Sequence, residues 1–272
     1  MANGKLTIVG TGILTPAHLS QEAINQIQYA DQVYVLVPDP LGLPTIQKLN
    51  KNVFDLGQLY YEEETERNGA NRVEGYNQMV DIIMSKVRQD LNVCAVFYGH
   101  PGVFVYPAHE CMILAKKEGY RAKMLPAISA EDCLFADLGV DPGDFGMQAY
   151  EATQFVLYNH PINTATPLIL WQIGVVGDIT FTKMQPSERG LSMLQERLLQ
   201  HYDHNHTLIL YEAATIPLMP PRIENIKVGE LQNASVKTIT TVYVPAVTEL
   251  NLDTEFCHRW EIDLNLLEKM SF

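Results

Sequence analysis

The sequence between residues 6 and 139 alternates short apolar runs with segments whose apolar residues repeat at helical spacing. The runs at 6–9, 33–37, 53–56, 93–96 and 121–125 are typical of buried strands. The segments between them are long enough for helices, for example the one that carries Met79, Val80, Ile83 and Val87. Because a helix between two strands brings the chain back in the same direction, this alternation predicts a mostly parallel sheet with right-handed crossovers, and therefore an α/β fold.

Two helix starts in this half carry recognisable capping residues. Ser20 precedes a segment with Ala23 and Ile27 on one face, so we expect its hydroxyl to cap that helix. Ser129 followed by Asp132 resembles a capping box, and Gly139 is placed to end the helix that follows. The acidic, irregular stretch at 57–72 is typical of a solvated loop, although a loop that is positioned by a rigid scaffold can also carry function.

The strand at 93–96 runs into Phe97-Tyr98-Gly99-His100-Pro101-Gly102-Val103-Phe104. Gly-His-Pro-Gly requires a sharp turn at the carboxyl end of the strand, which is where open α/β sheets bind ligands. Glycines let a ligand approach the main chain, and Tyr98 and His100 offer polar groups. A purely structural strand-to-helix turn is the alternative interpretation of this short motif.

A second glycine turn follows the first strand, at Gly10-Thr11-Gly12. It resembles the start of a dinucleotide fingerprint, but Thr15 stands where the third glycine is required, so that fingerprint fails. A tight turn over a ligand site and a plain strand–helix corner both remain open here.

The second half repeats the strand and helix signals less regularly. We expect strands at 148–152, 168–173, 207–211 and 237–244 and a helix at 187–202. The Gly-, Pro- and Asp-rich stretch before residue 147 suggests a division into domains at 1–126 and 127–246, with a tail at 247–272. In the tail, Phe256, Trp260, Leu264 and Leu267 are spaced as on one helix, which indicates either a packing helix or a contact with a dimer mate or another partner.

Composition excludes several functional classes. The net charge of −13, from 19 basic and 32 acidic residues, argues against nucleic acid or an anionic membrane as the main partner. The four cysteines show no CxxC pair or zinc spacing, which fits a reducing cytoplasm. We expect no signal peptide and no membrane span. His201, His204 and His206 could be read as a metal site, but without acidic or cysteine ligands nearby we expect a solvated helix end and no metal.

Several motifs in a fixed order resemble the tetrapyrrole methylase superfamily, and within it the borosin peptide backbone N-methyltransferases of the omphalotin type. The order is carried by residues 6–12, 98–104, 124–137, 150–154 and 211–214. The segments 98–104, 119–126 and 129–138 are similar to the borosin enzymes almost letter for letter, and the likeness covers roughly 6–246. The resemblance implies two α/β domains of the class III methyltransferase type, with S-adenosylmethionine bound in the cleft between them.

The same resemblance implies roles for individual residues. Matched position by position, the residues that would contact S-adenosylmethionine are Tyr98, His100, Val103, Ser129, Ala130, Gln172, Ala213, Thr240 and Thr241. Arg72 and Tyr76 match the family's catalytic pair, and Tyr61 matches a further active-site tyrosine. The segment 62–70 is longer here than the family segment to which it aligns, which affects the role of Tyr61 and the shape of the substrate channel.

The chemistry of backbone methylation explains why such residues are needed. A peptide nitrogen is a poor nucleophile because its lone pair is delocalised into the carbonyl group. The transition state is imidate-like, so the guanidinium of Arg72 can stabilise charge on the carbonyl oxygen. Tyr76 is assigned as the proton acceptor, with Tyr61 as an orienting group or alternate base. The sulfonium is a strong leaving group, so neither a metal nor a covalent intermediate is required.

The resemblance also implies the substrate and the assembly. Fungal members carry the substrate at their own C-terminus, whereas residues 247–272 here are charged and lack an apolar repeat. We therefore expect a separate precursor peptide, acted on in trans as in split bacterial systems, and a homodimer. Two alternatives remain: a precorrin or uroporphyrinogen ring methylase, and a non-catalytic module that binds S-adenosylmethionine or peptides.

Overall fold

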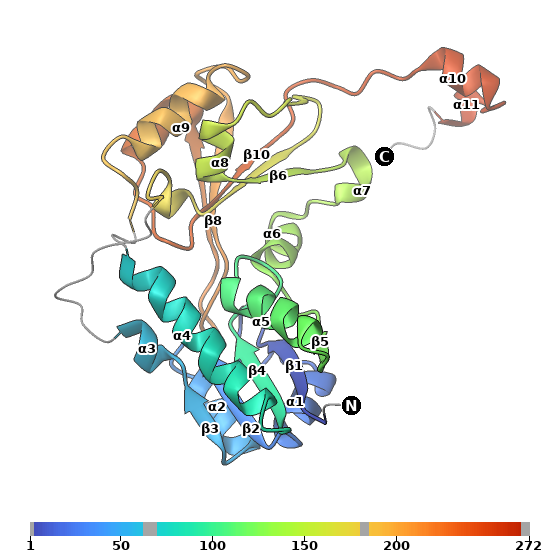
Figure 1. Cartoon of the computed structure of the whole chain (residues 1–272). Helices are drawn as coiled ribbons and strands as arrows, with labels where there is room; N and C mark the ends of the chain where they lie inside the picture. The colour runs from blue at the N-terminus through green and yellow to red at the C-terminus, as the bar shows by residue number, and fades with distance from the viewer. Residues whose placement is uncertain (1–2, 62–69, 180–184, 268–272) are drawn as a thin grey trace. The chain divides into compact units, whose positions relative to one another are not determined.

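A computed structural model describes residues 3–61, 70–179 and 185–267 (Figure 1). Contacts within the chain define two compact units, one built on Met1–Leu138 together with Glu212–Arg222, and the other on Gly139–Ile179, Lys183–Tyr211 and Ile223–Phe272. Each unit contains its own five-stranded sheet. Among the helices described, none is both long and apolar enough to cross a membrane.

The sheet of the first unit is parallel throughout. Its strands are β1 (Lys5–Gly10), β2 (Gln32–Leu36), β3 (Val53–Asp55), β4 (Asn92–Phe97) and β5 (Arg121–Met124), in the order β3-β2-β4-β1-β5. The central pair, β1 and β4, is in register from Lys5 opposite Asn92 to Gly10 opposite Phe97. The parallel α/β sheet predicted from the sequence is therefore confirmed.

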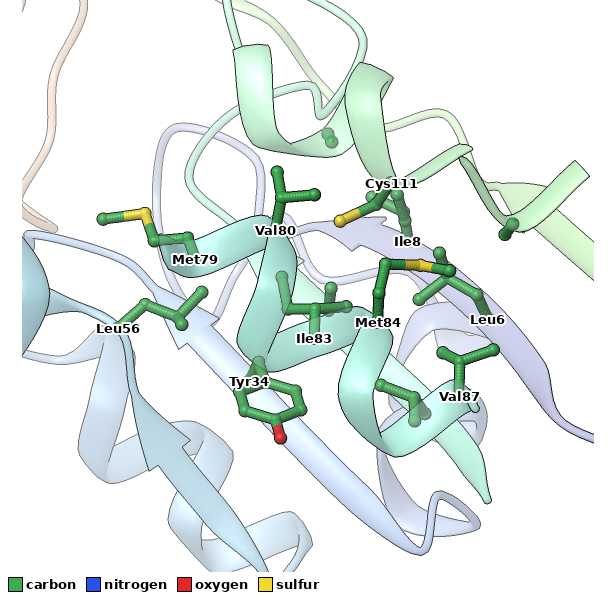
Figure 2. Packing of buried hydrophobic residues seen from close by; sticks show 14 of the residues in the cluster. Leu6, Ile8, Tyr34, Leu56, Met79, Val80, Ile83, Met84, Val87 and Cys111 are labelled. Atoms are coloured by element: carbon green, nitrogen blue, oxygen red, sulfur yellow. The ribbon is translucent and has the colours of Figure 1, made fainter. Parts of the chain in front are cut away.

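Helices cover both faces of this sheet. On one face, α4 (Ala70–Val87) and α5 (Tyr106–Lys117) pack on β1 and β4, and Figure 2 shows Met79, Ile83 and Val87 of α4 in the buried cluster that also contains Leu6 and Ile8. On the other face, α1 (Gln21–Gln28) and α2 (Gly42–Leu49) bury their apolar residues against β2 and β4. Each such side chain, once buried, stabilises the fold by about 1.5–3 kcal/mol.

The predicted helix caps are present. The Ser20 hydroxyl accepts a hydrogen bond from the Ala23 backbone N–H at 3.1 Å at the start of α1. At α6 (Ala130–Leu138), the Asp132 carboxylate accepts from both the backbone N–H and the hydroxyl of Ser129, at 2.6 and 2.7 Å. Gly139 then follows α6 with φ of +65°, a backbone conformation that favours glycine.

The loop predicted at 57–72 is wrong in part. Its first five residues form the helix α3 (Gly57–Tyr61), and α4 already begins at Ala70. The Asp55 carboxylate accepts from the Gly57 backbone N–H at 2.8 Å, which provides a turn before α3 that charge counting could not reveal. Residues 62–69, including the acidic run 62–64, lie outside the described residues.

The sheet of the second unit is mixed. Its strands are β6 (Gln148–Glu151), β7 (Leu168–Trp171), β8 (Thr207–Glu212), β9 (Arg222–Lys227) and β10 (Thr241–Val244), in the order β6-β7-β10-β8-β9. β6 and β7 are parallel, whereas β10 is antiparallel to both β7 and β8. The helices α8 (Ala152–Leu157) and α9 (Gly190–Leu198) and the 3-10 helix η2 (Val228–Asn233) surround its core.

Several predicted boundaries in this unit are wrong. The last strand starts at Thr241 instead of residue 237, because the preceding residues form a turn in which the Thr240 N–H donates to the Lys237 carbonyl at 2.9 Å. α9 starts at Gly190, since Ser187 closes a turn with Gly190 at 2.8 Å. The short helix α7 (Pro142–Phe145), the 3-10 helix η1 (Ile173–Val175) and the strand β9 carry no strong apolar period, so periodicity missed them.

The tail forms two short helices instead of the single predicted one. α10 (Thr254–Arg259) and α11 (Leu264–Leu267) are separated by a turn at Glu261, whose φ is +59°. Phe256 and Trp260 are 58% and 73% exposed, so they do not form a packing helix within the described chain. The Arg259 guanidinium lies over the Phe256 ring, 5.3 Å from its centroid.

Candidate functional site

Strand order places a crossover point at the centre of the first sheet. β1 and β4 are neighbours, yet β1 connects through α1 to β2 on one side, and β4 connects through α5 to β5 on the other. α1 and α5 pack on opposite faces, so the chain leaves the ends of β1 and β4 toward opposite faces of the sheet. In open α/β sheets such a switch point is where ligands bind. The two glycine turns singled out in the sequence lie at this place.

The two turns are joined through their main chains. Gly12 and Gly99 form an isolated antiparallel bridge, with N–H to carbonyl distances of 3.2 and 3.0 Å. Their φ values are +70° and +68°, which glycine adopts without steric cost. A Cβ at Gly10 would lie 2.1 Å from the Gly99 carbonyl oxygen, so this crossing requires glycine there as well. The result is a close, buried contact between the two turns, in which glycine lets the main chains meet.

Tyr98 connects four segments of this edge. Its hydroxyl donates to the Ile13 carbonyl at 3.0 Å, and its backbone N–H donates to the Leu36 carbonyl at 3.1 Å. Burial raises the pKa of Tyr98, and the nearby Asp39 carboxylate and Cys133 thiol raise it further. These neighbours belong to the loops after β1 and β2 and to α6, so the phenol stays protonated where these segments meet.

The turn after Tyr98 is ordered by its own hydrogen bonds. The Gly102 backbone N–H donates to Nδ1 of His100 at 3.0 Å, and the Val103 N–H donates to the His100 carbonyl at 3.0 Å. The Val103 side chain is 44% exposed, and Phe104 beside it has φ of +56°. Ser129 and Ala130 begin α6, the helix that carries Cys133. The predicted cofactor residues of the first unit thus lie on turns of the same edge.

The predicted catalytic residues belong to helices that start at this edge. In a parallel sheet, a helix that follows a strand begins at the carboxyl edge of the strands. α4 includes both Arg72 and Tyr76, and because these residues are four positions apart they belong to one face of the helix. The Tyr76 ring is half-buried and lies 6.0 Å, centroid to centroid, from the ring of Tyr106 at the start of α5. The side chain of Arg72 lies outside the described residues.

Tyr61 ends α3, which packs closely against α4. A Cβ at Gly75 would lie 3.3 Å from the Leu59 carbonyl oxygen, so the absence of a side chain at Gly75 allows the two helices to approach. Gly75 stands directly before Tyr76, and Leu59 stands two residues before Tyr61. The backbone therefore brings the ends of these two helices together, although the Tyr61 side chain is not among those described.

The remaining predicted residues belong to one edge of the second sheet. Gln172 follows β7 with φ of +59°, an uncommon conformation for a residue other than glycine. Thr240 and Thr241 are buried at the start of β10, which runs antiparallel to β7. Tyr211 near the end of β8 pairs with Thr241, and Ala213 follows directly after β8. The residues of this second set are thus near one another in the sheet.

Two buried oxygen atoms on the loops of the first sheet were not singled out by sequence reasoning. Asp39 follows β2 and Thr15 follows β1, and both Asp39 Oδ2 and Thr15 Oγ1 lack a hydrogen-bond partner among the described residues. Unpaired buried polar atoms cost free energy, and a ligand with donor groups can pair them. Asp39 could have been found from the sequence, because it is an acidic residue directly after a buried parallel strand. The described residues contain no group of three His, Cys, Asp or Glu side chains able to hold a metal ion.

Comparison with known proteins gives consistent matches. Residues 5–231 match the family model described as Tetrapyrrole (Corrin/Porphyrin) Methylases. The chain is 41% identical over 248 residues to a methyltransferase/ribosomally synthesized cyclic peptide gymnopeptides precursor from Gymnopus fusipes, covering 89% of this chain and 57% of that protein. It is 39% identical over 265 residues to the corresponding omphalotin A precursor from Omphalotus olearius, covering 95% of this chain and 62% of that protein.

One solved structure adds evidence on the fold. A uroporphyrin-III C-methyltransferase from Thermus thermophilus, complexed with S-adenosyl homocysteine, aligns with a TM-score of 0.56 at 14% identity, covering 89% of this chain and 92% of that one. At this identity the match supports the two-sheet α/β architecture alone. The chain spans about 57% and 62% of the lengths of the two fungal relatives.

Proposed function

Because the chain belongs to the family of tetrapyrrole (corrin/porphyrin) methylases, we propose that it is an S-adenosylmethionine-dependent methyltransferase that methylates backbone amides of a precursor peptide. The observation that carries this proposal is the identity of about 40% to fungal methyltransferases whose names include a cyclic peptide precursor. The placement of Arg72 and Tyr76 on one helix face at the ligand edge supports it.

The residues of the first edge fit the proposed cofactor. The exposed Val103 and the Asp39 carboxylate, whose Oδ2 has no hydrogen-bond partner among the described residues, suit a ligand that combines apolar parts with hydroxyl and amino donors. S-adenosylmethionine would supply an electrophilic methyl group carried on a sulfonium. Besides Val103, we propose that Tyr98, His100, Ser129 and Ala130 hold it in the first unit. Gln172, Ala213, Thr240 and Thr241 complete the proposed set.

The proposed reaction assigns one task to each side chain of the catalytic trio. Tyr76, acting as the phenolate, accepts the proton of the substrate N–H and becomes the neutral phenol, so that the nitrogen lone pair becomes available for the new N–C bond. Arg72 stays beside the substrate carbonyl oxygen and stabilises its growing negative charge. Tyr61 orients the peptide or serves as the alternate base. The remaining contribution is placement of the nitrogen in line with the transferred methyl carbon, away from water.

The substrate is proposed to be a separate peptide that binds in trans to a cytoplasmic homodimer. The two fungal relatives are named as methyltransferase and precursor in one protein. The alternative of a ring methylase has less support. A polyanionic ring substrate would need basic side chains to bind it, whereas the net charge of this chain is −13.

Two variants separate chemistry from cofactor binding. We expect Arg72→Ala to lower the methylation rate at least about 100-fold, because it removes stabilisation of the transition state, while the Kd for S-adenosylmethionine changes less than about twofold. Tyr98→Ala should weaken cofactor binding about tenfold or more, since it opens the edge where four segments meet. Isothermal titration calorimetry and single-turnover methylation measure the two effects.

Arg72→Lys is the matched control for charge, and circular dichroism checks that each variant is folded. The lysine retains the positive charge but loses the planar guanidinium, so partial activity is expected. If Arg72→Ala retains the full rate, or if its main effect is on the cofactor Kd, the role assigned to Arg72 is wrong.

A further inference from the structure

The turn at the end of β4 is held by a histidine that lies outside the motif. Nε2 of His109, on the first turns of α5, lies 2.9 Å from the Gly102 carbonyl oxygen. The backbone N–H of the same Gly102 donates to Nδ1 of His100 at 3.0 Å. One peptide residue therefore connects the two imidazole rings, through its carbonyl on one side and its N–H on the other.

These contacts fix the proton positions on both rings. A carbonyl oxygen can only accept, so Nε2 of His109 must carry the proton that it shares with Gly102. An N–H can only donate, so Nδ1 of His100 must be unprotonated. In neutral imidazole the proton then resides on the other nitrogen, and His100 is held as the tautomer with Nε2–H.

The absence of a side chain at Gly102 lets the His100 ring lie close to the main chain. A Cβ at residue 102 would lie 3.0 Å from Cε1 and 3.2 Å from Nδ1 of His100, so the ring rests against the bare main chain. The other end of the turn is fixed by the Gly12–Gly99 bridge. Between these two supports, the orientation of the His100 ring depends on where the Gly102 peptide is held, and His109 is the side chain that holds it.

We propose that His109 is a positioning residue, which holds Gly102 so that His100 offers its Nε2–H to an acceptor oxygen of the bound cofactor. The proposal rests on the proposed function for the role of His100, because S-adenosylmethionine carries such oxygens on its carboxylate and its ribose. His109 itself touches the turn and is not assigned a contact with the cofactor.

Histidine NMR tests the hydrogen-bonded chain without any turnover. We would record long-range ¹H–¹⁵N spectra of the ¹⁵N-labelled full chain at pH 8, above the ordinary histidine pKa of about 6.5, and assign His100 from the variant His100→Asn. In the wild-type protein we expect unprotonated Nδ1 and protonated Nε2 for His100. In His109→Ala we expect signals averaged over both tautomers, with cofactor Kd raised about two- to tenfold, the effect of one ordinary hydrogen bond.

Two further variants sharpen the result. His109→Gln can still donate an N–H to the Gly102 carbonyl, so it should restore both the tautomer and the Kd. His258→Ala removes an exposed histidine from the helix α10 and should change neither. An unchanged His100 tautomer in His109→Ala would overturn the proposal, as would a changed tautomer with unchanged cofactor affinity. If the wild-type chain binds no S-adenosylmethionine, the proposed function fails, and the tautomer spectra still decide whether His109 sets the state of His100.

Discussion

At the scale of single residues, burial raises the pKa of the two tyrosines Tyr202 and Tyr98. The Tyr202 side chain is 4% exposed, its hydroxyl has no hydrogen-bond partner among the described residues, and its ring is stacked on His206. Burial raises the pKa of Tyr202 to about 12. Tyr98 is shifted in the same direction. Both side chains are therefore neutral phenols in the folded protein at neutral pH. A raised pKa thus marks burial in both residues and does not by itself identify a catalytic base.

The Tyr202→Phe variant tests this account through the alkaline dependence of stability. In the unfolded chain Tyr202 ionises near the ordinary pKa of 10, whereas in the folded chain it stays protonated to about pH 12. Between these values the unfolded state binds fewer protons, so the free energy of unfolding falls as pH rises. Urea unfolding from pH 9 to 11.5 should show a shallower fall for Tyr202→Phe than for the wild-type chain.

At pH 7 the same variant should be neutral or more stable by up to about 1 kcal/mol, because it removes an unpaired buried hydroxyl. Tyr29→Phe is the control, since Tyr29 is 79% exposed and should alter neither quantity. A loss of more than about 1 kcal/mol at pH 7 would show that the Tyr202 hydroxyl has a partner and would contradict the account.

At the scale of elements, the contact between the turns that follow β1 and β4 defines the candidate site. The strand ends converge because Gly10, Gly12 and Gly99 leave room for main chains to meet, and helices on opposite faces then carry the chain away. The site is therefore a property of two strand ends more than of any single motif.

The variant Gly10→Ala should destabilise the first unit by about 3 kcal/mol. Its Cβ would meet the Gly99 carbonyl oxygen, which is main chain and can move only if the strand ends separate. Gly139→Ala is the matched control, because a Cβ at residue 139 would have open space around it. This variant should lower the free energy of unfolding by only about 1 kcal/mol, the cost of an alanine at a φ of +65°. Urea denaturation measures both, and equal losses in the two variants would contradict the role given to the crossing.

Much of this element level could be predicted from the sequence. The five strands of the first sheet, the Ser20 cap and the Ser129–Asp132 pair depend on local patterns, which apolar periodicity and capping chemistry reveal. Contacts between distant segments could not be predicted in this way. The bridge between Gly12 and Gly99 and the hydrogen bond from Tyr98 to Ile13 join residues whose distance in space depends on strand order.

At the scale of the whole molecule, two α/β units contribute two sets of proposed cofactor residues. The first set surrounds the switch point between β1 and β4, and the second lies where β7, β8 and β10 share an edge. The family model extends over residues 5–231, which includes the first sheet and the strands β6 to β9 of the second, whereas Thr240, Thr241 and β10 follow its end. The proposed peptide specificity depends on α3 and α4, the helices that carry Tyr61, Arg72 and Tyr76.

The most direct test of the central claim is tandem mass spectrometry of small proteins encoded beside this gene, each co-expressed with the full chain and, as control, with the Arg72→Ala variant. The account predicts methyl groups on backbone nitrogens of one such peptide with the wild-type chain and none with the variant. Methyl groups on side chains, equal methylation with Arg72→Ala, or unmodified peptides from a chain that instead methylates uroporphyrinogen would contradict it.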